Sequence, residues 1–444
     1  MLNKKEPLIS VGIMSGEKIS FIFEGEFFID GSQQAISGPF IAELKDGIIF
    51  CHSENAKFES SKEIIFKPGN SENSFILKEV TIGIKFHWER KEDEKFKGSL
   101  KIIKDKQSLI VINILSVEDY LVSVNSSEMS ARSSIDLLKA HTIVTRSWLL
   151  AQMEKSDENK NIYPRESTQN EIIKWYDKED HQYFDVCADD HCQRYQGITK
   201  ITTEVVRKAV NDTSGIIIES NGKICDARFS KSCGGISESF ENVWEPVKHD
   251  YLSSIIDYSS IPDNFNLDFS IESNAEKWIK GNPPAFCNSQ DKKVLSQILL
   301  DYDQETTDFY RWKIIYTQNE ISELIKKKSG IDFGDILDLI PIERGASARL
   351  IKLKIIGSKK TLIIGKELEI RRFLSESHLY SSAIIIEKSE IKANIPQKFL
   401  IYGAGWGHGV GLCQIGAAVM AENGYKYEEI LLHYFKGSNL KKIY

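Results

Sequence analysis

The sequence predicts an α+β fold, in which a β-rich N-terminal region precedes a mixed body. Over residues 8–115, apolar runs of strand length follow one another, and turn pairs such as Asp30-Gly31 and Asp46-Gly47 separate them. From residue 117 onward the apolar residues take helical spacing. We expect four regions: a β-rich region over 1–115, a body over 116–260, a compositionally mixed insert over 261–345, and the rest of the body over 346–444.

Helices are expected where start and stop signals flank apolar residues at spacings of three or four. One follows the N-cap pair Ser133-Ser134, and its apolar face contains Ile135, Leu138, Thr142, Thr145 and Leu149. Further helices are predicted over 202–213, over 321–329 with a stop at Gly330, and in two C-terminal segments closed by Gly424 and Gly437. The polar stretch 154–180 reads as a surface loop with one short helix around EIIKWY, and Asn221-Gly222 marks a hairpin turn.

Composition narrows the possible functions. The chain has 444 residues, with Lys+Arg 57 against Asp+Glu 64 and a net charge of -7. Hydrophobic residues make up 41% and charged residues 27%, which excludes disordered and collagen-like chains. The negative charge argues against non-specific nucleic-acid binding, but it is compatible with a neutral polysaccharide. No window approaches 18 uninterrupted apolar residues, so we expect no transmembrane segment.

The N-terminal segment MLNKKEPLISVGIM is basic at its start but has no apolar stretch of signal-peptide length. It is therefore not read as a secretory signal. The chain is expected either to be cytoplasmic or to have had a leader that was removed or misread.

A glycine-rich segment, Gly403–Gly411, places five glycines in nine positions. Such spacing allows positive φ and lets the backbone approach a ligand or another backbone closely. Trp406 and His408 stand between these glycines, and an indole face is a natural surface for stacking a sugar. The alternative is a tight turn with Trp406 in the core. The segment is no phosphate loop, because it does not have that spacing.

Glu128 lies in the polar sequence SVNSSEMSARSS, which we expect to be a turn before the helix that contains Lys139 and Arg146. A carboxyl group beside apolar Met129 can act as a general acid if burial raises its pKa. The alternative role for Glu128 is that of a capping or surface residue.

The seven cysteines are too few and odd in number for a disulfide scaffold, but four of them fall between Cys187 and Cys233. His181, Cys187 and Cys192, with His191 adjacent, offer the imidazole and thiolate ligands that zinc prefers. The alternatives are a Cys187–Cys192 disulfide or two free thiols. Another alternative is that Cys225 and Cys233 pair with each other across the predicted hairpin.

Together these segments resemble the stage II sporulation protein D / LytB (amidase-enhancer) family. The similarity is carried in order by VEDYLVSVNSSEM with SIDLLKAHTIVTRSWLLAQ, FDVCADDHCQRYQG, SCGGISESFENVW, EIRRFLSESHLYSS and GAGWGHGVGLCQIGAAVMAENGYKYEEILLHYFKG. They span about 117–437, and the mixed middle is the least similar part. The N-terminal β region contributes much less.

The resemblance implies a peptidoglycan lytic transglycosylase that acts on glycan strands stripped of stem peptides, with the SEM glutamate, Glu128, as sole acid and base. The product would carry a 1,6-anhydro end. The residues expected to contact the glycan are Lys139, Arg146, Trp406, His408 and Gln414. The alternative for Lys139 and Arg146 is a role as helix-surface charges. We expect the glycan in a cleft between residues 117–150 and the glycine-rich segment. No nucleotide or organic cofactor is implied.

The resemblance also implies that His181, Cys187 and Cys192 hold zinc, and that the protein works at the cell envelope or is secreted, which conflicts with the missing leader. One departure bears on activity: many relatives have a His-Ser pair where this chain has Ser230-Lys231. SEMS instead of SEMP is a smaller change. The departure favours the second hypothesis, a non-catalytic wall-binding protein that recruits or stimulates a cell-wall amidase.

Overall fold

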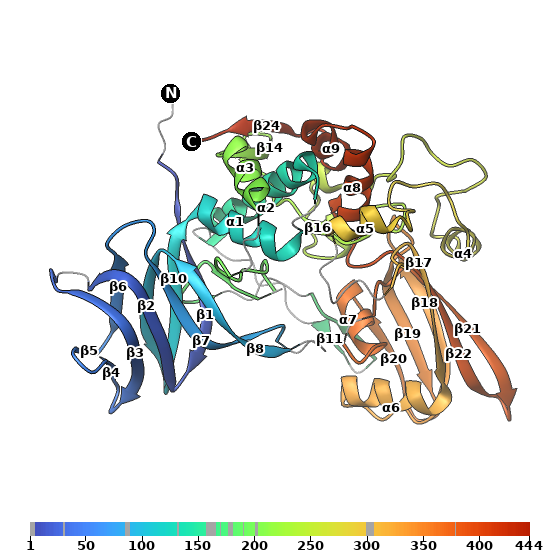
Figure 1. Ribbon diagram of the computed structural model, residues 1–444. Coiled ribbons are helices and arrows are strands. Elements are labelled where there is room, and N and C mark those ends of the chain that lie inside the picture. Colours follow the sequence, from blue (N-terminus) through green and yellow to red (C-terminus); the bar gives the residue numbers. More distant parts are fainter. Residues whose placement is uncertain are drawn as a thin grey trace.

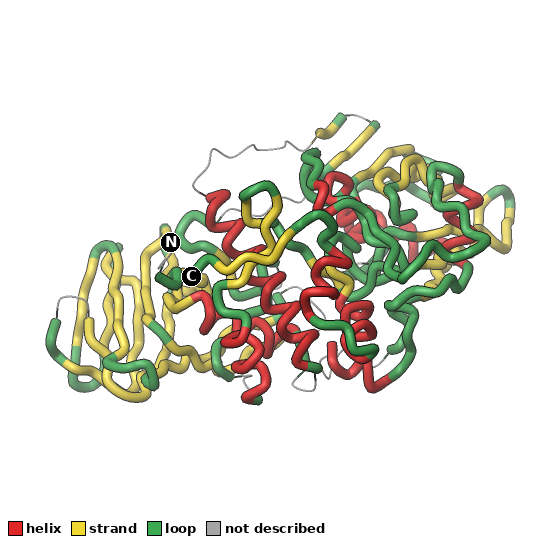
Figure 2. The backbone as a smooth tube through the Cα atoms, turned by 90° about the horizontal axis from the view of Figure 1, so that it is seen from above, coloured by secondary structure: helices red, strands yellow, loops and turns green. Residues whose placement is uncertain are grey.

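The computed structural model describes residues 5–29, 32–84, 89–130, 133–156, 166–168, 170–175, 181–189, 191–199, 203–298, 306–377 and 379–444. The fold is mixed and strand-rich, with several separate sheets. A large N-terminal sheet lies at one end, a group of helices occupies the centre, and a second strand-rich part lies at the other end (Figures 1 and 2). This arrangement confirms the predicted β-rich N-terminal region and mixed body. No helix within the described ranges has both the length and the apolar character needed to cross a bilayer.

The N-terminal sheet forms because nearly every strand buries one face. Its strands are β1 (Leu8–Gly16), β2 (Lys18–Ile29), β3 (Ala35–Lys45), β4 (Ile48–His52), β5 (Lys57–Ser60), β6 (Glu63–Pro68), β7 (Ser74–Ile82), β8 (Arg90–Lys97), β9 (Ser99–Asp105), β10 (Ser108–Ser116) and the short β13 (Val186–Cys187). Phenylalanines interlock in its core; Phe21 stacks on Phe40 with ring centroids 5.8 Å apart. β13 pairs in parallel with β1, which brings Cys187 to the sheet edge.

The central helices contain or adjoin several of the sequence motifs described above. They are α1 (Val117–Glu128), α2 (Ile135–Ser156), α3 (Glu204–Asp212), α5 (Lys292–Ile298), α8 (Gln414–Glu422) and α9 (Tyr427–Tyr434). The hydrophobic core is continuous from the N-terminal sheet through α1 and α2 to α8 and α9. The helices predicted after Ser133-Ser134 and over 202–213 are confirmed, as are the two C-terminal helices.

Short strands link the helices to distant parts of the chain. β14 (Ile216–Ser220) pairs with β15 (Lys223–Ile224) and with β24 (Asn439–Lys442), and β16 (Phe229–Ser230) pairs in parallel with β23 (Leu412–Cys413). The hairpin predicted at Asn221-Gly222 is confirmed, with φ of 52° and 79° at the two turn residues. The β16–β23 pair brings the third and fifth sequence motifs into contact.

The far strand-rich part has its own core. Its elements are β17 (Arg311–Thr317), α6 (Gln318–Ser329), β18 (Ile336–Arg344), β19 (Leu350–Gly357), β20 (Thr361–Gly365), α7 (Glu367–Phe373), β21 (Ile384–Lys392) and β22 (Ile395–Ala404). Three helices lie earlier in the chain: two 3-10 helices (Phe240–Asn242, Asp250–Leu252) and α4 (Glu272–Lys280). Gly330 caps α6 in the left-handed region, as predicted. The β18–β19 hairpin spans the boundary expected at residue 345.

Two predicted elements were wrong. EIIKWY contributes the strand β12 (Glu171–Ile173), which pairs with β20 in parallel and with β11 (Glu166–Ser167), because a sheet edge far along the chain was available to it. Glu128 lies in the last turn of helix α1 and not in a turn. The side chains of Asn125 and Ser126 hydrogen-bond back to the carbonyls of Leu121 and Val122, so these polar residues are accommodated in the helix.

Candidate functional site

Glu128 is held at the C-terminal end of α1. The helix begins at Ser116, whose Oγ accepts a hydrogen bond from the Asp119 N–H at 3.2 Å, and it ends at Glu128. The partly exposed carboxylate accepts a hydrogen bond from the backbone N–H of Arg194 at 3.1 Å. The chain that follows Cys192 therefore touches the carboxyl group expected to be catalytic.

This segment, residues 193–196, is fixed on the two main helices. The Tyr120 hydroxyl donates to Gln193 Oε1 at 3.3 Å, and Gln193 Nε2 donates to the Thr145 carbonyl at 3.3 Å. The backbone N–H of Gln196 donates to Ser123 Oγ at 3.2 Å. Because these groups are buried, the hydrogen bonds fix the position of the segment relative to α1 and α2.

His181, Cys187, His191 and Cys192 form a cluster whose four ligand atoms all lie within 4.8 Å of one another. His181 Nε2 is 3.4 Å from Cys192 Sγ, and His191 Nδ1 is 3.6 Å from Cys192 Sγ and 3.9 Å from Cys187 Sγ. Hydrogen bonds from Cys192, His181 and His191 hold the pKa of Cys187 well below its ordinary value. Both cysteines are free thiols, so the alternative of a Cys187–Cys192 disulfide is not realised.

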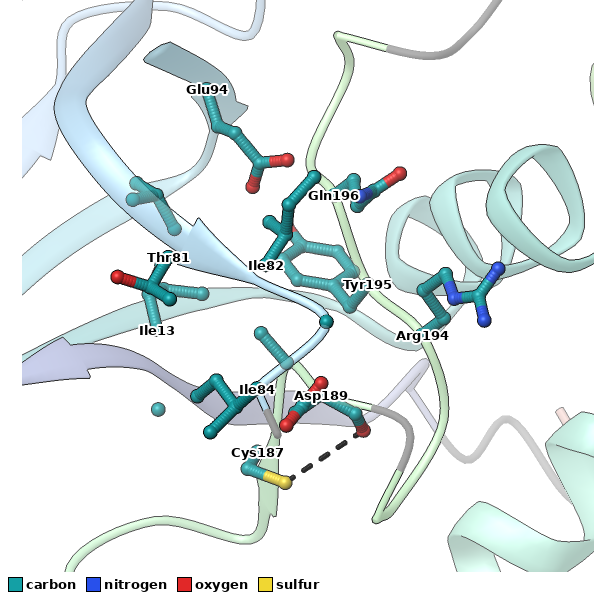
Figure 3. Close-up of a pocket in the computed structure, with 14 residues that line it drawn as sticks. Ile13, Thr81, Ile82, Ile84, Glu94, Cys187, Asp189, Arg194, Tyr195 and Gln196 are labelled. Carbon is teal, nitrogen blue, oxygen red and sulfur yellow. Dashed lines mark hydrogen bonds between the residues drawn. The ribbon is translucent and has the colours of Figure 1, made fainter. Parts of the chain in front are cut away.

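A pocket opens beside this cluster, between the edge of the N-terminal sheet and the segment 187–196 (Figure 3). Cys187, Asp189 and Arg194 line it on one side, and Ile13 and Ile82 on the other. Arg194 contributes its backbone N–H to Glu128 and also lines the pocket, so pocket, cluster and Glu128 are neighbours. Glu128 itself is not one of the residues that line this pocket.

Several buried polar atoms on α1, α2, β16 and α8 have no hydrogen-bond partner. Within the described part of the chain they include Ser127 Oγ, His141 Nε2, Ser230 Oγ and Gln414 Nε2. The His141 ring is 4.8 Å from that of Phe229, and Ser230 pairs with Cys413, the residue before Gln414. An unsatisfied buried polar atom costs about 1–3 kcal/mol. Such atoms mark a place where water or a ligand supplies the partners.

His141 is the functional candidate that sequence reasoning missed. It is fully buried on α2, and its Nδ1 is 2.8 Å from Asn125 Oδ1, one turn before Glu128. Burial, helped by the charge of Lys231, lowers the pKa of His141 to about 3, so the ring is neutral at pH 7. No local pattern marks it, because its partners come from α1 and β16.

Arg146 and Lys139 are engaged in ion pairs within the fold. Arg146 is fully buried; its Nε and Nη2 donate to the two carboxylate oxygens of Glu118 at 2.9 and 2.5 Å. Glu118 stands ten residues before Glu128 on the same helix, or about 15 Å along its axis. Lys139 Nζ is 2.9 Å from Asp212 of α3. The contact of Lys139 and Arg146 with glycan stays a prediction.

Trp406 and His408 lie on the glycine-rich loop with much of their surface in contact with the protein. The Trp406 ring stacks on Tyr380 with centroids 3.9 Å apart and also packs against Phe309. His408 Nδ1 accepts a hydrogen bond from the Val410 N–H at 3.0 Å. Desolvation and three nearby guanidinium groups lower the pKa of His408 to about 3.

The loop glycines allow close packing within the chain. Gly405, Gly407, Gly409 and Gly411 all have positive φ. A Cβ on Gly409 would lie 2.4 Å from the Arg349 guanidinium carbon, and one on Gly411 would lie 2.1 Å from the Arg228 carbonyl oxygen. These glycines could bring the backbone close either to a ligand or to another part of the chain. In the structure the close neighbours are other parts of this chain. The expected cleft between α1, α2 and this loop stays a prediction.

Lys231, the departure from the relatives' His-Ser pair, lies close to the segment that follows Glu128. Its Nζ donates to the Ile298 carbonyl at 2.9 Å, and the neighbouring Gln297 carbonyl accepts the Ser130 N–H at 2.9 Å. A positive charge therefore occupies the side of the site formed by the end of α5.

Comparison with known proteins supports the family seen in the motifs. Residues 105–219 match the sequence model for the stage II sporulation protein, and residues 238–411 match a domain of unknown function, DUF8618. An uncharacterised protein of Brachyspira hyodysenteriae is 26% identical over 78% of this chain and 72% of its own length. Stage II sporulation protein D of Bacillus amyloliquefaciens is 22% identical over 74% of this chain and 75% of its own.

The amidase enhancer of Bacillus subtilis is 27% identical over 52% of this chain, and the match covers 32% of that longer protein. The matched residues 105–219 include α1 with Glu128, α2 and the His/Cys cluster. The chain is thus similar to the stage II sporulation protein D / amidase-enhancer family, and the match to its sequence model covers residues 105–219.

Proposed function

We propose that this protein acts on the bacterial cell wall as a peptidoglycan lytic transglycosylase, with Glu128 as the single acid and base. The observation that carries the proposal is the placement of the partly exposed Glu128 carboxylate at the end of α1, anchored by the Arg194 N–H, inside the segment that matches the stage II sporulation protein model. The similarity to an amidase enhancer and to stage II sporulation protein D supports a role at the cell wall.

One carboxyl group is sufficient for the reaction. The protonated Glu128 gives its proton to the glycosidic oxygen as the bond from that oxygen to the anomeric carbon breaks. The 6-hydroxyl oxygen of the same sugar then bonds to the anomeric carbon, and the Glu128 carboxylate takes the hydroxyl proton. The products are a free 4-hydroxyl and a 1,6-anhydro end, and no water is consumed.

The test uses peptide-free glycan strands and detection of 1,6-anhydro products by mass spectrometry. We expect the wild type to release product and Glu128→Gln to release at least about 100-fold less, since general acid–base catalysis contributes about 10²–10⁴-fold. Glu204→Gln is the matched control, because that side chain is 92% exposed at the start of α3. Equal release by wild type and Glu128→Gln would contradict the assignment.

A second candidate function is non-catalytic glycan binding that stimulates a cell-wall amidase. It is supported by the similarity to the Bacillus subtilis amidase enhancer and by Lys231 beside the site. It predicts saturable binding of the same glycan strands without product, together with faster release of stem peptides when an amidase is added. Product formed by the wild type alone would decide in favour of the enzyme. Either function places the protein at the cell envelope.

We also propose that His181, Cys187, His191 and Cys192 hold zinc. Two imidazoles and two thiols within 4.8 Å of one another match the ligand type and number of a closed tetrahedral site. Zinc there would supply a structural cross-link between β13 and the segment that donates to Glu128. Metal analysis tests this: Cys192→Ser should lose one equivalent of zinc, and Cys51→Ser, a buried cysteine in the N-terminal sheet, should lose none.

A further inference from the structure

A second set of metal-ligating side chains lies in the interior, apart from the His/Cys cluster. Cys233, Asp257, Cys287 and Cys413 each offer one ligand atom, and these atoms all lie within 4.8 Å of one another. All four side chains are buried, with exposures of 2% or less. The residues come from three distant segments: the turn after β16, the region between the 3-10 helices and α5, and β23. From the geometry we infer that this Cys3Asp cluster binds zinc.

The separations suit a metal and not a disulfide. Cys233 Sγ and Cys287 Sγ are 3.6 Å apart, whereas a disulfide requires about 2.05 Å. Two sulfurs bound to one tetrahedral zinc at about 2.3 Å are about 3.8 Å from each other. The observed spacing is therefore close to that of two ligands on one ion. Thiolate and carboxylate are both common zinc ligands, and a set of three sulfurs disfavours magnesium and calcium.

Hydrogen bonds between the four residues, and one from Tyr434, orient the ligand atoms. Asp257 Oδ2 accepts the Cys287 N–H at 2.9 Å, and Asp257 Oδ1 accepts the Tyr434 hydroxyl at 2.6 Å. Cys413 Sγ accepts the Cys233 N–H at 3.2 Å. A carboxylate has about four lone-pair sites, so Asp257 keeps capacity for an ion. Ligands fixed in this way are typical of metal sites.

Charge provides a second, independent observation. Three thiolates and one carboxylate around Zn²⁺ leave an excess of negative charge, which a buried site must balance. The Arg311 guanidinium donates to the Gly234 carbonyl at 3.1 Å, and the Arg349 guanidinium donates to the Cys233 carbonyl at 3.1 Å. The hydrogen bonds of the Arg311 guanidinium within the described ranges all go to backbone carbonyls and none to a carboxylate. Its charge is thus available to the cluster.

The packing beside the cluster depends on a glycine. Gly416, on α8, allows the arrangement, since a Cβ there would lie 2.2 Å from the Tyr434 hydroxyl oxygen and 2.5 Å from Asp257 Oδ1. A bound zinc would join the turn after β16, residues 257–287 and the start of α8, and so hold one end of the glycine-rich loop in place.

The experiment separates this site from the His/Cys cluster. The full chain is prepared with Cys187→Ser and Cys192→Ser together, loaded with zinc, dialysed and assayed by inductively coupled plasma mass spectrometry. We expect about one zinc per chain in this background, falling below about 0.2 when Cys413→Ser is added. Cys225→Ser, which removes a buried cysteine outside the cluster, should leave the zinc content unchanged.

A second measurement covers the case in which Cys413→Ser fails to fold. Co²⁺ loaded into the folded Cys187→Ser/Cys192→Ser protein should give thiolate-to-cobalt charge-transfer bands in the near ultraviolet and tetrahedral d–d bands in the visible. Less than about 0.2 zinc per chain in that folded protein, or cobalt spectra without thiolate bands, would overturn the assignment. So would an equal loss of zinc from Cys225→Ser and Cys413→Ser.

Discussion

The carboxylate of Glu128 and the backbone N–H of Arg194 are joined by a 3.1 Å hydrogen bond that links the end of α1 to the chain after the His/Cys cluster. We predict that Glu128→Asp, which withdraws the carboxyl group by one methylene, lowers the rate of 1,6-anhydro product release by about 100-fold. Glycan binding, measured by co-sedimentation with insoluble strands, should change little. A rate equal to that of the wild type would contradict a positioned acid.

Because the Arg146–Glu118 ion pair is buried, we predict that truncating Arg146 greatly lowers the unfolding free energy. Arg146→Ala leaves the Glu118 carboxylate with the Gly215 N–H and the Tyr444 hydroxyl but no cation. Breaking such a pair costs about 3–5 kcal/mol of unfolding free energy. Urea denaturation followed by tryptophan fluorescence measures it, with the half-exposed Arg207→Ala as control. A loss below about 1 kcal/mol, the usual value of a surface pair, would refute the buried role.

Because His141 is buried as a neutral ring, we predict that the protein loses stability in mild acid. Its pKa is about 3 in the fold and 6.5 when unfolded, so protons bind preferentially to the unfolded chain as the pH falls below 6.5. The contribution of neutral His141 to the unfolding free energy is therefore fully present above pH 6.5 and is lost progressively as the pH falls toward 3. For this residue alone, the unfolding free energy should be about 2 kcal/mol lower at pH 5 than at pH 7.5.

Comparison with His141→Gln, which does not titrate, isolates this contribution. The difference in unfolding free energy between pH 7.5 and pH 5 should be smaller in the variant by that amount, as measured by urea denaturation at both values. An identical pH dependence in the two proteins would show that His141 is not buried as a neutral ring.

Gly409 and Gly424 form a matched pair of substitutions. Both have positive φ, of 78° and 88°, but a Cβ on Gly409 would meet the Arg349 guanidinium at 2.4 Å, while a Cβ on Gly424 would meet no atom within 4 Å. Gly424→Ala should cost about 1–2 kcal/mol for the backbone alone. Gly409→Ala should cost about 1–3 kcal/mol more because of the clash. Equal thermal shifts would mean that Arg349 moves aside freely.

Local signals predicted the elements that depend on neighbours in sequence. Helix α6 starts at Thr317 with a capping box to Glu320 and stops at Gly330, so its limits are encoded within one stretch. The hairpin at Asn221-Gly222 is of the same kind. Glu128 was also selected from its motif, but its placement on α1 was not, because buried back-bonding of Asn125 and Ser126 overrides their preference for turns.

The mixed fold class, the resemblance to the stage II sporulation protein D motifs and the ligand types of the His/Cys cluster follow from the sequence alone. Which side chains meet depends on the tertiary fold. His141 contacts Asn125 of α1 and Phe229 of β16 because α2 packs on both elements. Arg146 forms an ion pair with Glu118, at the other end of α1 from Glu128. Cys233 and Cys413 are 180 residues apart in the chain and meet through the β16–β23 pairing. Contacts of this kind depend on chain closure over long separations, for which a local sequence pattern carries no signal.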